Sequence, residues 1–160
     1  LESIADEERL NKKYELEEVF LDQYVITAKA GLKKVTISSE ENYKEALDSE
    51  EERYKDGLRA LTAAAKDNIM IFEGQAEIRE GITTIHNQNI EKINEAHRQY
   101  ELREERRVED EMMNYRRQIN EATIQDEIAM LEDWLQKYKL TQEERMAILL
   151  RIAALEKKIA

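Results

Sequence analysis

The chain has 160 residues, of which 38% are charged; none is proline or cysteine, and four are glycine. The lack of cysteine excludes disulfides and thiolate metal sites, and the net charge of −11 argues against binding to nucleic acid or to an anionic lipid surface, because both need a positive face. Helix breakers are scarce and most charged residues are helix-favouring Glu, Lys and Arg, so the composition predicts an all-α protein.

The apolar residues form narrow stripes through this charged sequence. Such stripes are typical of long amphipathic helices in a coiled coil or an elongated bundle. An ordinary helical bundle with a solvated surface is the alternative. No apolar run approaches the roughly 18 residues that a membrane-spanning helix needs, so we predict no membrane span.

The pattern divides the chain into three segments. We expect an acidic helix over 1–37, a long helical segment over 38–122 and a helical hairpin over 123–160. The chain begins at Leu1 in the middle of a pattern, which indicates a fragment of a longer protein. Ser38 is followed three residues later by Glu41, the spacing of a capping box, which predicts a helix start after a short turn.

The segment 38–122 carries a weak eleven-residue repeat. Tyr43-Lys-Glu-Ala-Leu47 is echoed by Tyr54-Lys-Asp-Gly-Leu58. Three phases extend the echo: Tyr43, Tyr54, Ala65 and Ala76; Leu47, Leu58 and Ile69; Glu50, Leu61 and Phe72. Eleven residues over three turns favour a straight or slightly right-handed supercoil. Chance similarity among helix-forming residues is the alternative, and a fold-back at Gly57, Gly74 or Gly81 stays open.

Further along, the stripe moves to a new face: Ile78, Ile82, Ile85, Asn89 and Ala96. Asn89 is polar at an apolar position. It is either a buried amide that sets the register or oligomer number of a coiled coil, or a solvated residue at a loosened layer. The sequence favours neither.

Residues 98–117 are dominated by charges, and opposite charges three or four residues apart support a helix there. A thin apolar stripe continues through them: Val108, Met112, Tyr115 and Ile119. We interpret this stretch as a solvated helix, and a mixed-charge surface that docks a partner is the alternative.

The last segment shows the clearest helical pattern. Two faces repeat at spacings of three and four, one formed by Ile128, Leu131, Leu135 and Tyr138 and the other by Ile148, Ile152, Leu155 and Ile159. Between them, Thr141 and Glu144 have the spacing of a capping box. Two amphipathic helices with so short a link predict an antiparallel αα-hairpin.

Candidate catalytic and metal-binding groups do not assemble into a site. His86 and His97 lie eleven residues apart, about 16 Å along a helix, so they cannot share a metal ion within it. We interpret both as exposed helix histidines. The carboxylates lie among cations, and glycine-rich phosphate loops and nucleophile elbows are absent. We therefore predict no catalytic residues, no cofactor, no metal and no enzymatic activity.

The stretch Ile128-Ala-Met-Leu-Glu-Asp-Trp-Leu-Gln-Lys-Tyr-Lys-Leu-Thr-Gln-Glu-Glu-Arg145 leads into a second amphipathic helix. Over roughly 120–160 this pattern resembles the helix–LTxEER–helix units that recur in the helical regions of phage tail tape measure proteins. Upstream of it, the similarity rests on charged, proline-free helix with Tyr-x-x-x-Leu spacing.

The resemblance implies a structural role in assembly. Tape measure proteins lie in the lumen of the tail tube, tube subunits polymerise around them, and their length sets the length of the tube. It implies partners among tail tube subunits, a location in the virion tail lumen or the host cytoplasm, and no catalytic residue in such helices. The competing hypothesis is a helical scaffold or protein–protein interaction module that self-associates or binds partner helices.

Overall fold

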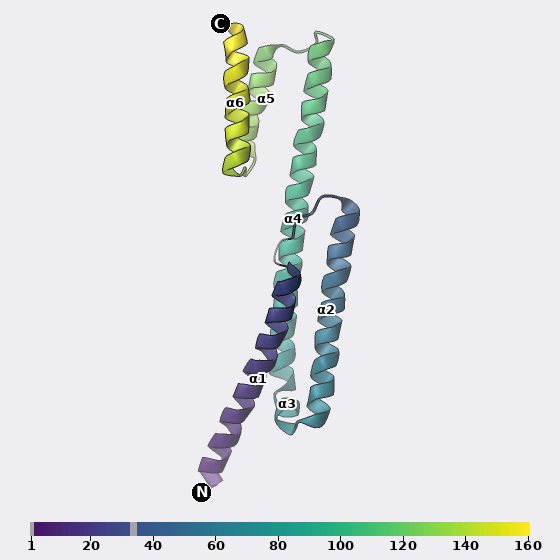
Figure 1. The fold of residues 1–160 in the computed structure, drawn as a ribbon, viewed down its shortest axis with the longest axis vertical. Helices are drawn as coiled ribbons and strands as arrows, with labels where there is room; N and C mark the ends of the chain where they lie inside the picture. The colour runs from purple at the N-terminus through teal and green to yellow at the C-terminus, as the bar shows by residue number, and fades with distance from the viewer. Residues whose placement is uncertain (1, 33–34) are drawn as a thin grey trace. The chain divides into compact units, whose positions relative to one another are not determined.

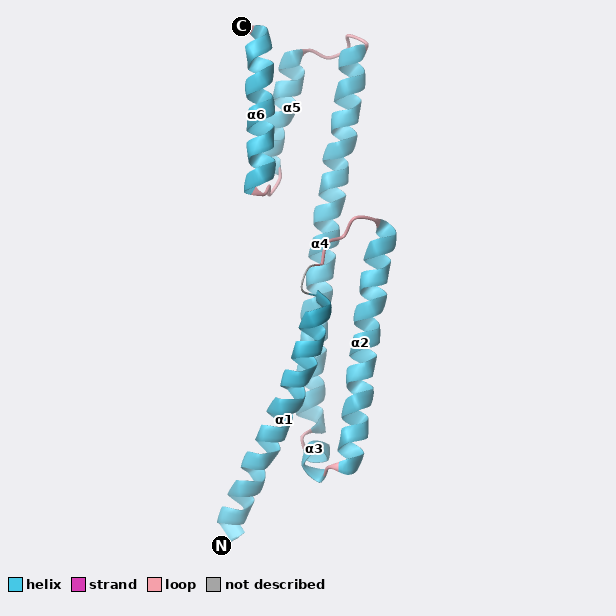
Figure 2. Cartoon of the chain, viewed as in Figure 1, coloured by secondary structure: helices cyan, strands magenta, loops and turns pink. Residues whose placement is uncertain are grey.

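The computed structural model describes residues 2–32 and 35–160, and every regular element within these ranges is an α-helix. In chain order these helices are α1 (Glu2–Leu32), α2 (Glu40–Asp67), α3 (Ile69–Glu73), α4 (Gln75–Gln118), α5 (Ile124–Lys137) and α6 (Gln142–Ile159) (Figure 2). The prediction of an all-α protein is confirmed. Of its described helices, none is both long and apolar enough to cross a membrane.

The chain forms two compact units, Leu1–Arg98 and Gln99–Ala160, and α4 contributes to both. The expected segment boundaries, after 37 and after 122, lie in the connections just before α2 (from Glu40) and α5 (from Ile124). The boundary between the two units lies elsewhere, inside α4. The sequence pattern therefore located connections between helices, and it did not locate the boundary between the two compact units.

In the first unit, α2 runs antiparallel to residues 75–98 of α4 (Figure 1). Tyr43, near the start of α2, stacks on His97, and Tyr54, further along α2, stacks on His86. Residue numbers thus rise on one helix as they fall on the other. The long segment expected over 38–122 is folded back on itself.

Two single-residue breaks flank α3 and produce this reversal. Asn68 leaves helical geometry at φ −138° and ψ 115°, and its side chain accepts the backbone N–H groups of Met70 and Ile71. Gly74 ends α3 at φ −92° and ψ 6°, a conformation open to any residue. The chain turns at Asn68 and Gly74, the residues at the two ends of α3, whereas Gly57 and Gly81 lie inside helices.

The core of the first unit forms where α1 packs on this pair. Its buried members are Tyr24, Leu61, Ala65, Ile71, Ile78 and Ile82. Gly57 lets the ring of Tyr24 approach α2, because a Cβ atom at this position would lie only 2.6 Å from Tyr24 Cε2. The docking of α1 therefore depends on a missing side chain.

The eleven-residue phases do not describe which side chains are buried beyond α2. Ile69 and Phe72, the third members of two phases, are 67% and 61% exposed, and Ala76 is exposed as well. In α3 it is Ile71, between these two residues, that joins the buried cluster of Leu61 and Ala65. The repeat survives in the two Tyr–His stacks.

In the second unit, α5 and α6 lie side by side and share an apolar cluster (Figure 1). Its buried members are Leu131, Trp134, Tyr138, Ile152 and Leu155, with Ile128, Leu135 and Ile148 partly buried beside them. Leu102 of α4 packs against the same cluster. Trp134 was not among the predicted packing residues.

Ile159 was predicted to pack between the last two helices, and this is wrong. It is the last residue of α6 and its side chain is exposed. The two helices are joined at the start of α6, and α5 is the shorter of the two. The end of α6 therefore extends past α5, which leaves Ile159 uncovered. Helical spacing alone does not show where the neighbouring helix stops.

Helix caps fix the starts of α2, α5 and α6. Thr141 and Glu144 form both hydrogen bonds of a capping box on α6, and Thr123 and Asp126 do the same on α5. The cap predicted at Ser38 is wrong: Ser39 is the N-cap of α2 and accepts the N–H of Asn42. Glu41 lies in the first turn of α2, where its negative charge interacts favourably with the helix dipole.

Candidate functional site

A buried carboxylate lies between α2 and α4 in the first unit. The side chain of Glu50 is fully buried. Its Oε1 accepts a 3.2 Å hydrogen bond from Asn89 Nδ2 and lies 3.2 Å from His86 Nδ1, while its Oε2 lies 3.5 Å from Arg53 Nη2. An isolated buried charge is very costly, so these partners are what allow Glu50 to occupy the interface. We call Glu50, Arg53, His86 and Asn89 the Glu50 layer.

The Glu50 layer decides between the two interpretations of Asn89. Its side chain is buried and bonded to the opposite helix, so the solvated alternative is wrong. A polar residue at such a position favours one alignment of two helices, because any other alignment would leave buried polar groups without partners. The register role itself stays a prediction.

The two histidines are packed side chains, which corrects the expectation that they are exposed. The ring centroids lie 4.1 Å apart in the Tyr54–His86 stack and 3.8 Å apart in the Tyr43–His97 stack. His97 Nε2 also lies 2.9 Å from Oε1 of Glu40. Each stack therefore joins α2 to α4 through aromatic contact.

The tyrosine hydroxyls repeat the same arrangement. Tyr43 donates a 2.6 Å hydrogen bond to Asn94 Oδ1, and the hydroxyl of Tyr54 lies 3.0 Å from Thr83 Oγ1. In both cases the hydroxyl partner precedes the stacked histidine by three residues. The eleven-residue spacing seen in the sequence of α2 thus has a counterpart on α4.

A second group of polar side chains lies where α1 meets α2 and α3. Glu17 is buried and packs against Gly74. Burial, followed by the hydrogen-bonded contact with Glu77, raises the pKa of Glu17. Burial and then the charge of Glu50 raise the pKa of Tyr24 to about 12.

A pocket of about 290 Å³ opens where Tyr24 of α1 contacts Gly57 of α2. It is lined by Phe20, Gln23, Tyr24, Arg53, Asp56, Gly57 and Ala60.

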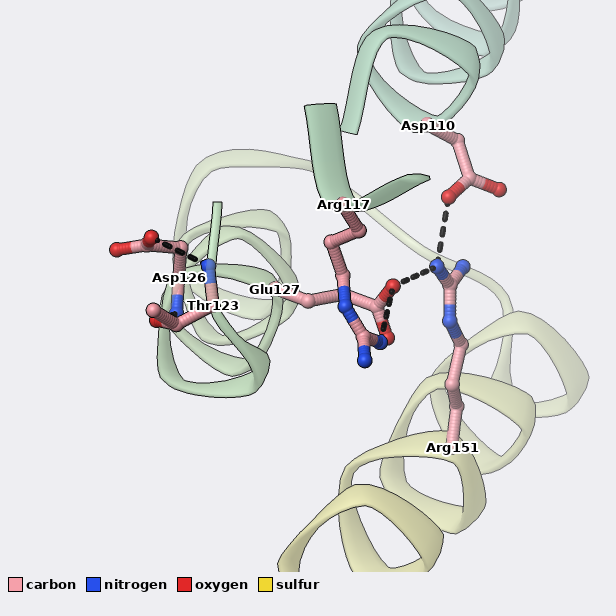
Figure 3. A network of polar contacts seen from close by, with 6 residues as sticks. All are labelled: Asp110, Arg117, Thr123, Asp126, Glu127 and Arg151. Carbon is pink, nitrogen blue, oxygen red and sulfur yellow. Dashed lines mark hydrogen bonds and ion pairs between the residues drawn. The ribbon is translucent and has the colours of Figure 1, made fainter. Parts of the chain in front are cut away.

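The second unit contains a buried carboxylate of its own (Figure 3). Glu127 of α5 is 4% exposed, and its Oε1 lies 3.4 Å from Arg117 of α4 and 3.4 Å from Arg151 of α6. Arg151 also donates a 2.7 Å hydrogen bond to Asp110, and this bond is the main reason why its pKa is raised. The network links all three helices of the unit.

Further polar contacts fix α4 to the α5–α6 pair. Trp134 Nε1 donates a 2.6 Å hydrogen bond to Glu109, and Arg106 donates a 2.7 Å bond to Glu144. The guanidinium of Arg106 also lies 5.1 Å from the ring centre of Tyr138. Residues of α4 therefore contact Glu144, which caps α6, and Trp134 and Tyr138, which belong to the apolar cluster shared by α5 and α6.

Apolar side chains remain exposed on the other side of α4. Val108, Met112, Tyr115 and Ile119 lie at spacings of four and three, and each is 43–58% exposed. We call these four residues the α4 strip. On α6, Met146, Leu149 and Leu150 are exposed in the same way.

Sequence reasoning missed several of these residues. Glu50 and Glu127 looked like solvated carboxylates, because their partners lie far away in the sequence or on other helices. Thr123 with Asp126 had the spacing of a capping box and could have been found from it.

Among the residues that the structure describes, no three His, Cys, Asp or Glu side chains lie close enough to hold a metal ion. The arrangement of the described polar groups is one of ion pairs, stacks and caps between helices. No protein-family model, no curated protein and no solved structure matches this chain.

Proposed function

We propose that this chain is a structural or assembly protein that acts through contacts between helices. The observation that supports this most is the α4 strip, where four large apolar side chains at helical spacing are exposed to solvent. A row of this kind is how one amphipathic helix recognises another. Helices of a coiled coil or an elongated bundle are the architecture in which such contacts would be made.

The most specific form of this proposal is a ruler segment like those of tape measure proteins. It rests on the resemblance over roughly 120–160, with α5 and α6 acting as an antiparallel αα-hairpin that is capped at Thr141. In this role the helices would set the length of a tail tube. The alternative is a helical scaffold or interaction module, in which the α4 strip binds a partner helix and length has no role.

A paired deletion distinguishes the two forms in phage particles that carry this chain. Removing 44–50 together with 89–95 takes seven residues from each of two antiparallel helices and keeps the remaining side chains in phase. A ruler predicts a shorter tail, by about 21 Å if the helices are extended end to end and about half of that if they stay folded back. A scaffold predicts unchanged length.

A substitution on the strip provides the matched experiment. Met112→Lys places a charge in the middle of the α4 strip without touching the apolar clusters. A scaffold predicts that assembly fails while the isolated protein keeps its helicity, as measured by circular dichroism. Asn114→Lys, at an exposed position of the same helix outside the strip, serves as the control. If neither the deletion nor Met112→Lys alters assembly, the structural role is wrong.

A further inference from the structure

A seam of buried side chains runs through the fold-back without changing its spacing. From Glu50 to Asn89, one residue every three or four positions is buried or half-buried: Glu50, Tyr54, Gly57, Leu61, Ala64, Asn68, Ile71, Gln75, Ile78, Ile82, Ile85 and Asn89. This alternation of four and three is the seven-residue pattern of a left-handed coiled coil. A turn between two helices does not require the pattern to continue across it, but here it does.

The seam is also symmetric. Its positions mirror one another about a point between Ile69 and Met70, at the start of α3. Glu50 mirrors Asn89, to which it is hydrogen-bonded, and Leu61 mirrors Ile78 in the same core cluster. Two copies of one continuous helix, aligned antiparallel, would place Glu50 of one copy opposite Asn89 of the other and Leu61 opposite Ile78, the pairs that the folded-back chain brings together.

Nothing in the covalent structure of the fold-back prevents a continuous helix. Asn68 and Gly74 are single-residue breaks, the chain has no proline, and Gly74 does not adopt a positive φ. The folded-back form leaves Ile69 and Phe72 largely exposed at the turn. Apolar residues exposed at a hinge favour an alternative in which they gain contacts.

We propose that a second copy of this chain is the partner of the α2–α4 surface, through exchange of helices. In the exchanged dimer, α2, α3 and α4 join into one helix, and α2 of each copy pairs with α4 of the other. The Tyr43–His97 and Tyr54–His86 stacks and the bond between Glu50 and Asn89 then form between copies. The two states share these contacts and differ at the hinge, which is the condition for domain swapping.

Contacts of α1 with the hinge hold the folded-back form. Arg9 forms an ion pair with Glu73 of α3, and the side chain of Glu17 fills the space beside Gly74. A Cβ atom at Gly74 would overlap the carboxyl group of Glu17. Straightening of the hinge therefore requires that this end of α1 release α3.

The test strengthens the continuous helix and measures mass. Asn68→Leu removes the cap of α3 and puts an apolar residue into the seam, and Gly74→Ala favours helix while displacing Glu17. We expect wild-type protein refolded at high concentration to contain a species of twice the 18.9 kDa chain mass, measured by light scattering. The double variant should dimerise at least tenfold more tightly. Gly81→Ala, inside α4, is the control.

Energy transfer between labels identifies the exchange. The chain has no cysteine, so Glu41→Cys and Arg98→Cys can each be labelled singly on exposed positions. After joint refolding of the two labelled chains, an exchanged dimer places residue 41 of one copy beside residue 98 of the other. Two copies that are both labelled at residue 41 should show no transfer, because these positions lie about 85 Å apart.

Two outcomes would overturn the proposal. One is a wild-type chain that stays monomeric after refolding at every concentration, since the seam would then pair only within a chain. The other is a dimer with transfer between the two residues 41, which would mean that copies associate through another surface. If the double variant does not fold, as judged by circular dichroism, the wild-type experiment decides alone.

Discussion

At the scale of single residues, the hydroxyl of Tyr24 is one of four buried side-chain polar atoms without a hydrogen-bond partner among the described residues. Tyr24→Phe removes this group and keeps the ring on Gly57, so we expect it to be neutral or to raise the free energy of unfolding by about 1 kcal/mol at pH 8. Urea unfolding measures the difference, and a clear loss of stability would show that the hydroxyl has a partner.

The effect of Tyr24→Phe on the free energy of unfolding should depend on pH. The phenol of Tyr24 has a pKa of about 12, raised by burial, so its neutral form is favoured in the folded state. Its contribution to stability is complete below the unfolded pKa of about 10 and is lost as the pH rises from there toward 12. Tyr24→Phe lacks this loss, so its advantage over wild type should grow between pH 9 and pH 11.

Gly57 and Gly81 give a matched pair of predictions inside helices. Alanine normally stabilises a helix by about 1 kcal/mol relative to glycine. At Gly57 the new methyl group would press on the ring of Tyr24, and we expect a net loss of about 1 kcal/mol. At Gly81 it meets the terminal methyl groups of Leu21, which can turn away, so Gly81→Ala should be neutral or stabilising. Equal effects in urea unfolding would contradict this packing.

Side chains whose partners are local could be predicted from the sequence, and those with distant partners could not. The cap of α6 depends on Thr141 and Glu144, three residues apart. The N-cap of α2 was misplaced by one because Ser38 and Ser39 are neighbours, and Asn42 decides between them. The burial of Glu50 depends on Asn89, on another helix and far along the chain.

At the scale of helices, the start of α5 depends on ionised Asp126. The backbone N–H of Thr123 donates a 2.8 Å hydrogen bond to its carboxylate, and this bond is the main cause of its lowered pKa. A carboxylate with a lowered folded pKa adds stability above its unfolded pKa, and this stability is lost as the pH falls through the folded value.

Asp126→Asn should therefore lose stability at pH 7 and should depend less on pH than wild type between pH 5 and pH 2. Thermal unfolding across this range provides the comparison. Asp133→Asn, an exposed residue in the middle of the same helix, is the control and should follow wild type. Parallel pH curves for wild type and Asp126→Asn would mean that the carboxylate does not cap α5.

The pairing of α2 with α4 shows why the periodicity was assigned as eleven residues. The buried or half-buried residues on the paired helices and the turn include Glu50, Gly57, Asn68 and Gln75, which are polar or small and give no apolar signal. Tyr43 and Tyr54 of α2, which are eleven residues apart, stack on histidines of α4. Periodicity counted from apolar residues alone therefore followed the more visible pattern.

At the scale of the whole molecule, composition was sufficient for the all-α fold, because proline and glycine are scarce along the entire chain. It was not sufficient for the chain reversal at α3, since Asn68 and Gly74 are both compatible with a continuous helix. That choice depends on whether residues 50–89 pair with one another or with a second copy, which is a matter of tertiary contacts and concentration.

The fold-back of α2 on α4 is the central claim, and one distance tests it most directly. A single chain labelled at both Glu41→Cys and Arg98→Cys is diluted into excess unlabelled protein, and the separation of the labels in the monomer is measured by electron spin resonance. The fold-back predicts a separation of roughly 20 Å, about two helix diameters. A separation near 85 Å in the monomer, as in one continuous helix, would contradict it.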